Sequence, residues 1–455
     1  MRAVFRLGFA GILWACLVRA GVAAEAPELR LLVIGDAHSA YERSAQVLAR
    51  VDRFKAEQPG VPLAVLLNGD ALEYGNSVAR RTAGALDFAW FKALAARVPT
   101  VMNLGNHEPE FYDVAETVRR LEAAGLKVIS GNLRNPANGQ PYAPATLKLT
   151  LGKRELTLVG ITTDRLNTYR VAIRPQLDLA DPVVWGRANF PALLRDAALP
   201  VVLSHAGLKA DRALFGAVPG GTLFAGAHDH LRLVHREPGG PLYFHSGSWL
   251  ETVAVATLQR KAADGTATWQ VEQIALRPED PAEPELARQI AATLAQHLTA
   301  EETTVVGRTA QALSPSEAAA FAVAAARTAA GADVAVVGAT TFGAGLPAGA
   351  VTRFAFDACV RFDGPLFAAE VDGAWLRRLV ARCNHGPDTP FAARTGENLV
   401  AAAGPGEFVA GRRYRFVTTD WIAKNAAQYL GENPPELKEA GGLRLKAAVL
   451  QALAR

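Results

Sequence analysis

Residues 98–110 read VPTVMNLGNHEPE, an apolar run that ends in an amide, an imidazole and two carboxylates. Short apolar runs of this length are typical of buried β-strands. The chain has only nine histidines, yet His107 and Asn106 stand side by side directly after this run. A single strand end of this kind usually forms an ordinary turn, so its meaning depends on how the other strands end.

Short apolar runs recur from Leu29 to about Leu276, separated by amphipathic helix-like segments or loops. They read LRLLVIG, LAVLLNG, LKVIS, LTLVGIT, LPVVLSH, GTLFAG, LYFHSG and ETVAVATL. The early alternation with helical segments predicts an α/β unit, and the later crowding of strands predicts an antiparallel portion. We therefore expect a layered α/β structure.

The length and composition favour two globular domains, because 455 residues, half of them hydrophobic, exceed one ordinary core. The proline-rich and charged stretch RPEDPAEPE (277–285) marks a break, and a helix-like segment from Glu285 to His297 follows it. We predict a first domain over residues 25–280, a linker helix within 281–300 and a C-terminal domain over 301–455.

The first 24 residues have the pattern of a signal peptide. Arg2 and Arg6 precede an apolar stretch from Leu7 to Val18, and small residues surround Ala24. A retained membrane anchor is disfavoured, because the stretch is shorter than the roughly 20 residues that a span needs. We predict a periplasmic or secreted protein without a stable membrane anchor.

Loss of this segment changes the charge and the cysteine content. Three arginines leave with it, so the formal net charge falls from +4 to +1. Nothing in that balance predicts binding to nucleic acid. Cys359 and Cys383 remain, and in an export compartment they can form a disulfide or stay as two buried free thiols. The sequence leaves both states open, and it gives no indication of the oligomeric state.

Side chains capable of binding metals end five of the apolar runs. Each one alone usually belongs to a turn or is a satisfied histidine, but a sheet brings its strand ends to one edge. Five imidazoles and two carboxylates in one crevice would be costly to desolvate unless a cation joined them. The residues at these strand ends are Asp36, His38, Asp70, Asn106, His107, His205, His228 and His230.

The mixture of ligand types limits which metal ions are expected at the site. Imidazole, carboxylate and amide oxygen without thiolate favour zinc, manganese or iron over copper or an iron–sulfur centre. Asp70 is central, because a carboxylate can bridge two ions about 3.5–4 Å apart, a spacing that suits phosphoryl transfer. We therefore predict two divalent ions, with Asn106 as an oxygen ligand and His107 free for another role.

Five short motifs in this region resemble the signature blocks of the calcineurin-like dimetal phosphoesterases. They are GDAH, NGD, GNHE, LSHAG and GAHDH, in the family's order and spacing, although Ala227 stands where the family usually has glycine. VISGNLRNPANGQPY, RFDGPLFAAEVDGAWLRRLV and RYRFVTTDWIAKNAAQYLG resemble parts of the secreted 5′-nucleotidases. The resemblance implies a four-layer α/β sandwich followed by a smaller α/β substrate-binding domain.

The resemblance also implies individual roles. It assigns the first ion to Asp36, His38 and His230, the second ion to Asn106, His205 and His228, and the bridging position to Asp70. His107 matches the catalytic histidine of the family. Its acidic partner, three positions on, is Glu110 here instead of the usual aspartate, and Glu108 is expected to face the surface or cap the next helix.

The C-terminal half departs from the 5′-nucleotidase pattern. Phe362 and Tyr429 fall on the two positions that stack on a nucleotide base, although ordinary core aromatics would give the same pattern. Gly338 and Gly343 stand where the family has an asparagine and a phosphate-binding arginine. We expect Arg308 to retain one basic contact with the substrate.

Together these patterns predict a periplasmic dimetal hydrolase that cleaves nucleotides or related small phosphate esters by attack of metal-bound water on phosphorus. Two alternatives remain. One is a non-catalytic binding or accessory protein of the same fold, and the other is a sulfur-ester hydrolase of the thiosulfate-oxidation type.

Overall fold

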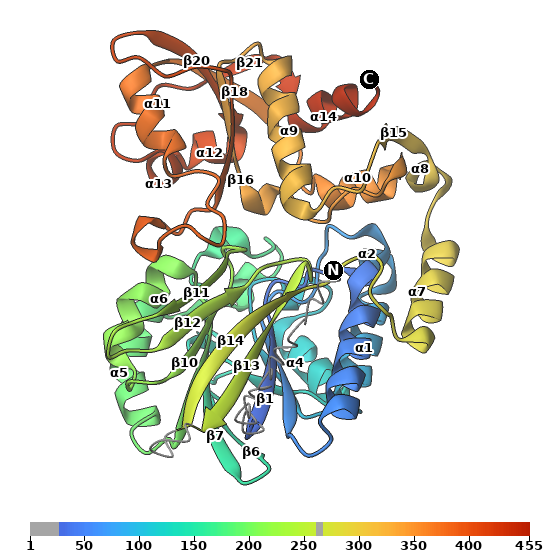
Figure 1. Cartoon of the computed structure of the whole chain (residues 1–455), viewed down its shortest axis with the longest axis vertical. Coiled ribbons are helices and arrows are strands. Elements are labelled where there is room, and N and C mark those ends of the chain that lie inside the picture. Colours follow the sequence, from blue (N-terminus) through green and yellow to red (C-terminus); the bar gives the residue numbers. More distant parts are fainter. Residues whose placement is uncertain (1–26, 261–266) are drawn as a thin grey trace, which may run out of the picture.

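The computed structural model describes residues 27–260 and 267–455, so the predicted signal peptide over residues 1–24 lies outside the described residues. Figure 1 shows two domains stacked along the long axis of the molecule, the first coloured blue to yellow-green and the second orange to red. Within the described ranges, no helix is both long enough and apolar enough to cross a membrane.

Two six-stranded sheets form the N-terminal domain. In spatial order, the first contains β14 (Ala267–Ala275), β13 (Thr252–Arg260), β1 (Leu29–Ile34), β2 (Leu63–Asn68), β3 (Thr100–Asn103) and β4 (Lys127–Ile129). The second contains β11 (Arg232–Arg236), β12 (Leu242–Ser246), β10 (Leu223–Gly226), β9 (Leu199–His205), β7 (Arg154–Thr162) and β6 (Thr146–Leu151). Strands β1 to β4 are parallel to one another, as are β7, β9, β10 and β12. A short pair, β5 (Leu133–Arg134) and β8 (Asp178–Leu179), lies outside both sheets.

The two sheets pack face to face because their strands are apolar on both sides. In β1, Leu29, Leu31 and Val33 enter the core between the sheets, and Leu32 and Ile34 face the helices. One outer face is covered by α1 (Tyr41–Glu57), α2 (Ser77–Thr82), α3 (Ala85–Ala95) and α4 (Val114–Ala123), the other by α5 (Pro182–Leu193) and α6 (Leu208–Leu214). The predicted four-layer sandwich is confirmed.

The segment after the first domain forms a helix that packs on that domain. Helix α7 (Pro284–His297) buries Leu286 and Ile290 in the core beside the first sheet. The next helix, α8 (Ala300–Thr303), starts with a capping box between Thr299 and Glu302. Glu302 also pairs with Arg81 of α2 at 2.6 Å, which ties the start of the second half to the first domain.

The C-terminal domain is built on a five-stranded sheet, with a separate pair of β15 (Val305–Thr309) and β17 (Gly349–Thr352). Its strand order is β19 (Leu399–Ala403), β16 (Val334–Gly338), β20 (Arg413–Thr419), β18 (Pro365–Asp372) and β21 (Lys438–Arg444). One face is covered by α9 (Pro315–Ala329), α10 (Arg353–Cys359) and α14 (Leu445–Leu453), the other by α11 (Gly373–Val380), α12 (Asp420–Lys424) and α13 (Ala426–Leu430). Cys359 and Cys383 are buried in these two different clusters as free thiols.

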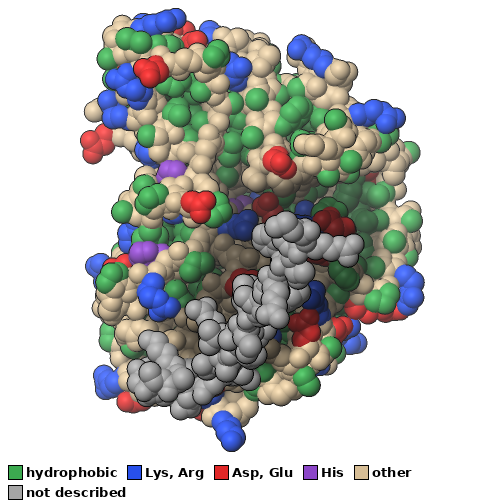
Figure 2. Space-filling model, in the orientation of Figure 1, with side chains coloured by type: hydrophobic (Ala, Val, Ile, Leu, Met, Phe, Trp, Pro, Cys, Tyr) green, Lys and Arg blue, Asp and Glu red, His purple; other side chains and the backbone are tan. Residues whose placement is uncertain are grey.

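Surface charges are mixed on the face drawn in Figure 2. Lysine and arginine side chains are scattered among aspartates and glutamates and do not gather into one basic stripe on the visible atoms.

Candidate metal centre

The candidate ligands lie at the carboxyl ends of parallel strands from both sheets. The loops after β1, β2 and β3 carry the candidates of the first sheet, and the end of β9 and the loop after β10 carry those of the second. The expectation that a single sheet edge gathers these groups is wrong in one respect, because the edges of two facing sheets meet at the site. The first sheet supplies Asp36, His38, Asp70, Asn106 and His107, and the second supplies His205, His228 and His230.

Two buried asparagines hold the two sheet edges together beneath the site. The Asn68 side-chain amide donates to the carbonyl oxygens of Ser204 at 3.0 Å and Ala225 at 2.9 Å, both in the second sheet. The Asn103 amide donates to Asn68 Oδ1 at 3.1 Å and to the Ile161 carbonyl at 2.9 Å. These bonds fix the distance across which the ligands of the two sheets must meet.

The backbone of the site is strained. Non-glycine residues in the left-handed region cost about 1–3 kcal/mol each and cluster at functional sites. Gly69, with φ of 79°, approaches closely as well, since a Cβ there would lie 2.4 Å from His205 Nδ1. The candidate ligands in this region are Asp36 (φ 53°), His38 (48°), Asp70 (53°), His228 (79°) and His230 (55°).

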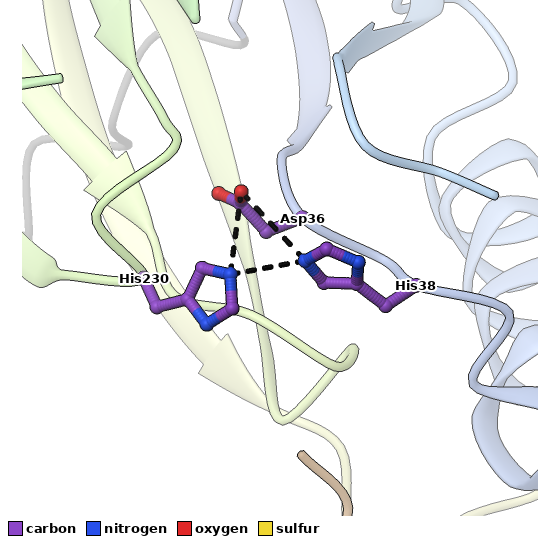
Figure 3. A group of neighbouring side chains, drawn as sticks. All are labelled: Asp36, His38 and His230. Atoms are coloured by element: carbon purple, nitrogen blue, oxygen red, sulfur yellow. Dashed lines mark hydrogen bonds and ion pairs between the residues drawn. The ribbon is translucent and has the colours of Figure 1, made fainter. Parts of the chain in front are cut away.

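Asp36, His38 and His230 form one cluster, and Figure 3 shows their polar atoms converging from two segments of the chain. The Nε2 atoms of His38 and His230 are 3.0 Å apart, and they lie 4.0 Å and 3.7 Å from Asp36 Oδ1. Burial lowers the pKa of His38 to about 4, which keeps the imidazole neutral. Burial also lowers the pKa of His230 and raises that of Asp36 to about 8, so the carboxylate form of Asp36 needs a cation beside it, and two imidazoles with this carboxyl group fit a divalent ion.

Asp70, His205 and His228 form the second cluster, and Asn106 joins it. The His205 Nδ1–H donates to the Asn68 carbonyl at 2.8 Å, so in the neutral ring the lone pair of Nε2 faces Asp70 Oδ2, 3.0 Å away. Although burial opposes protonation, Asp70 raises the pKa of His205 to about 10 in the metal-free protein. Asn106 Oδ1 lies 3.1 Å from His228 Nδ1. Without a metal ion, a proton on His205 Nε2 satisfies the contact with Asp70, and a divalent ion could take its place, so the residues fit a second metal ion.

Asp70 lies between the two clusters. Its carboxylate shares one potential metal group with His38 and His107 and another with His205 and His228. Its Oδ1 also accepts a hydrogen bond of 2.8 Å from the backbone N–H of His107, which fixes the orientation of the carboxylate. This is the position that a bridging ligand needs.

His107 and Glu110 form a pair beside the two clusters. His107 Nδ1 lies 2.9 Å from Glu110 Oε1, and its Nε2 lies 3.9 Å from Asp70 Oδ2. Although burial opposes protonation, Glu110 and Asp70 raise the pKa of His107 to about 10. Glu110 also accepts from the backbone N–H of Tyr74. The longer glutamate thus reaches the imidazole at the position where the family usually has aspartate.

The expectation for Glu108 is wrong. Its side chain is only 1% exposed, and its carboxylate accepts backbone N–H groups of Asp70 at 3.0 Å, Ala71 at 2.7 Å and Gly105 at 2.5 Å. Glu108 therefore joins the loop after β2 to the loop after β3. Two of the three donors lie far away in sequence, which is why the local pattern suggested a surface position or a helix cap.

A cavity of about 1060 Å³ opens above the metal clusters and is lined by both domains. Phe362 and Tyr429 both line it, and the indole N–H of Trp421 donates to the Tyr429 hydroxyl at 3.1 Å. Phe362 is 54% exposed and is therefore not a core aromatic. An aromatic ring of a ligand would find apolar surface on this side of the cavity.

Arg308 and the two substituted glycines do not reach this cavity. Arg308 is exposed on β15, opposite Ala350 of β17, and it does not line the cavity. The sequence placed it near the substrate from a short local pattern, which could not show how β15 is oriented. Gly338 ends β16, and a Cβ on Gly343 would lie 2.6 Å from the ring of Trp249 in the first domain.

The cavity residues that were not predicted from the sequence include Glu73, Arg165, Arg361 and Trp421. Glu73 stands three positions after Asp70 in NGDALE, and Arg361 directly precedes Phe362 in RFDG. Their positions were visible in the sequence, but nothing local indicated that they would meet. Arg165 follows β7 in a loop that carries no recognisable motif.

The fold and the two clusters define a dimetal centre at the edge of a two-sheet sandwich. Residues 29–232 match the model of the calcineurin-like phosphoesterase family, so this region is a calcineurin-like phosphoesterase domain and the predicted resemblance is confirmed. Members of that family use two divalent metal ions, and the two Asp/His clusters agree with this. Alanine fits at position 227, where the family usually has glycine, because the backbone φ there is not positive. Its methyl group packs against Gly35.

The likeness to solved structures extends over both domains. A sulfate thiohydrolase from Thermus thermophilus has a TM-score of 0.64 at 15% identity and covers 94% of this chain and 95% of its own. A 5′-nucleotidase precursor from the same organism has a TM-score of 0.59 at 18% identity, with coverage of 93% and 96%. The predicted second, α/β domain is confirmed as part of this two-domain fold.

A curated relative matches a shorter region. An apyrase from Aedes aegypti is 31% identical over 140 residues, which are 29% of this chain and 24% of the apyrase. The matched region thus spans about a quarter of that relative.

Proposed function

We propose that the protein is an exported, metal-dependent hydrolase of small phosphate esters, of the nucleotide or related phosphoester class. The observation that carries this proposal is Asp70, which groups with His38 of the first cluster on one side and with His205 and His228 of the second on the other, with the His107–Glu110 pair beside it. The domain bounds of 25–280, 281–300 and 301–455 and the leader over residues 1–24 belong to the same proposal. The N-terminal sequence supports export.

Two divalent ions supply Lewis acidity and lower the pKa of water, which is the chemistry that ester hydrolysis needs. The protein's own residues fix the geometry. Glu110 holds the Nδ1 side of His107, so Nε2 is left to donate a proton or a hydrogen bond to an oxygen of the phosphoryl group. The raised pKa of His107 favours this protonated form.

The rest of the cavity is suited to an anion with an aromatic leaving group. Phe362 and Tyr429 offer ring faces for the leaving group. Arg165 is half-buried in the cavity wall, and within the described residues its guanidinium makes no hydrogen bond or ion pair. Arg165 is the cation we expect to bind the substrate, in place of the family arginine that Gly343 replaces.

The charge of Arg165 acts on the second cluster. Burial has the largest effect on the pKa of both His228 and Asp229, lowering the first and raising the second. The positive charge of Arg165 is a smaller influence that lowers the pKa of each. Arg165 is therefore within electrostatic reach of the position where a phosphoryl group would meet the metal ions.

The first test is turnover of bis-p-nitrophenyl phosphate, AMP and UDP-glucose by the purified protein with manganese, with zinc and with chelator. Turnover that depends on metal and is lost in His107→Ala supports the hydrolase, and the preferred ester identifies the leaving group. Two bound metals without turnover of any ester would contradict it and favour the non-catalytic or sulfur-ester alternative.

A further inference from the structure

Glu73 is a buried carboxylate that contacts His38 and belongs to neither of the two ligand clusters, although it lies near enough to His107 and Glu110 to form a further group of possible ligands. Its side chain is 4% exposed, and Oε2 lies 3.2 Å from His38 Nδ1. Oε1 accepts a 2.7 Å hydrogen bond from the backbone N–H of Gly75, which holds the carboxylate in place. His38 thus has Nδ1 against Glu73 and Nε2 directed at the first cluster.

The partner of Glu73 comes from the other domain. Arg361, which precedes β18, donates to Glu73 Oε2, 288 positions away, and its side chain is 5% exposed. Arg361 also donates through Nη1 to the Thr340 carbonyl at 3.2 Å and through its backbone N–H to the Thr341 carbonyl at 3.1 Å. The guanidinium is therefore anchored in the C-terminal domain and reaches into the first domain.

An aromatic ring reinforces this junction. Trp249 stacks on His38, with ring centroids 5.3 Å apart and planes inclined by 22°. The Arg361 guanidinium lies 5.2 Å from the Trp249 ring, and Gly343 packs closely against the same ring. Two segments of the C-terminal domain thus contact the side chains that surround His38.

The geometry points to a positioning role for Arg361: through Glu73, the C-terminal domain orients His38 and so sets the affinity of the first metal position. A guanidinium favours the carboxylate form of a glutamate, and a carboxylate that accepts Nδ1–H fixes the tautomer with Nε2 free for metal. Metal binding at Asp36, His38 and His230 therefore depends on a residue of the other domain. The second cluster has no such link among the described contacts of Arg361.

Metal titration is the test, because it requires no substrate and gives a result even if the protein hydrolyses no ester. Metal-free protein is titrated with Mn²⁺ in a calorimeter, and two sites are fitted. We expect Glu73→Gln to weaken one of the two sites about 10- to 100-fold, as loss of an outer partner of a ligating histidine does. Arg361→Gln should weaken the same site by about tenfold.

A double variant separates action through Glu73 from an independent effect. If Arg361 acts through Glu73, the Glu73→Gln/Arg361→Gln protein binds Mn²⁺ no more weakly than Glu73→Gln alone. This variant also leaves no buried unpaired charge, so it remains informative if Arg361→Gln alone does not fold. Arg361→Lys, which keeps the charge, should restore part of the affinity.

The matched control is Arg353→Gln, which breaks another arginine–carboxylate pair of the same domain. Arg353 lies 2.9 Å from Asp357, and both side chains are about one-third exposed. This variant should leave both sites unchanged. Unchanged Mn²⁺ affinity in Arg361→Gln, or losses that multiply in the double variant, would overturn the positioning role. His107 Nδ1 is also 3.8 Å from Glu73 Oε2, so turnover is not used as the readout.

Discussion

The cavity has two walls: the metal wall, formed by the candidate ligands of the first domain, and the C-terminal wall, formed by aromatic residues of the second domain. They differ in how firmly the fold holds their side chains. On the metal wall, Asp36 and Asp70 are 1% and 2% exposed and have strained backbones. On the C-terminal wall, Phe362 and Trp421 are 54% and 41% exposed. Bond cleavage needs atoms fixed to within a fraction of an ångström, whereas recognition of a leaving group needs an accessible surface. The difference agrees with the proposal that the first domain carries the chemistry and that the C-terminal domain contributes surface for the leaving group.

The largest effect should come from the metal wall. Asp70→Asn removes the charge shared by the two clusters, and we expect one metal ion per chain to be lost and kcat/KM to fall by about 10³-fold or more, since a metal contributes several kcal/mol. Elemental analysis and turnover would measure this. Chelated wild-type protein, with Mn²⁺ then restored, is the reversible control. Two tightly bound metals in Asp70→Asn would rule out the bridging role.

The next largest effect should come from His107, and it distinguishes a proton donor from a metal ligand. We expect His107→Gln to lower kcat by about 10²- to 10⁴-fold, the range for a general acid, with metal content unchanged. Glu110→Gln should show part of that loss, because it leaves His107 in place without its carboxylate partner. Loss of metal from His107→Gln would mean that this residue is a ligand.

Substitution of Arg165 would show whether the metal wall also contributes to substrate binding. Arg165→Ala should raise KM by about 10- to 100-fold with little change in kcat, since a charge-assisted hydrogen bond is worth about 1.5–3 kcal/mol. The control is Lys209→Ala, which removes an exposed cation from the same cavity. Equal losses in the two variants would point to the general field of the cavity and not to a contact made by Arg165.

The C-terminal wall should affect only substrates with an aromatic leaving group that reaches it. Phe362→Ala or Tyr429→Ala should raise KM for AMP by roughly threefold to tenfold, as expected for a lost ring contact of about 0.5–1.5 kcal/mol. The KM for phenyl phosphate should change less, because its leaving group is smaller than a nucleoside. Equal changes for both substrates would place the rings outside the leaving-group site.

The smallest effect should arise outside both walls, at the Arg81–Glu302 pair. Although burial opposes ionisation, Arg81 lowers the pKa of Glu302 from 4.5 to about 2. Because the folded pKa is the lower one, the stability from this pair is present above about pH 4.5 and is lost as the pH falls towards 2. Glu302→Gln should therefore cost about 0.2–1 kcal/mol at pH 7, with a shrinking difference in melting temperature on acidification. A difference that grows at low pH would contradict this sign.

The same contrast explains what the sequence could predict. The residues of the metal wall could be predicted from the sequence because each candidate ligand lies at the end of its strand or within a few residues after it. Asp36, Asp70 and His205 could therefore be found from local patterns. The layered fold followed from the same runs. The sequence could not show that two sheets supply the site, because the Asn68 and Asn103 hydrogen bonds that join the sheets link distant segments.

The C-terminal wall was less predictable for the same physical reason. Phe362 and Tyr429 reach the cavity, but Arg308 does not, since its orientation depends on how β15 pairs with β17. Arg361 meets Glu73 only after the two domains have packed. Contacts between domains leave no periodic pattern in either segment, so only the structure reveals them.

The close packing of Gly343 against Trp249 limits the evolutionary routes open to this protein. A Cβ at position 343 would lie 2.6 Å from the Trp249 ring and 2.4 Å from the Ala358 carbonyl, so even alanine does not fit. A smaller residue in place of Trp249 would relieve only one of these two clashes, because the Ala358 carbonyl would remain, and it would also remove the ring that stacks on His38. Any side chain at position 343 would require both the Ala358 backbone and the Trp249 ring to move, so a lineage that carries this glycine could not gain an arginine there by one substitution.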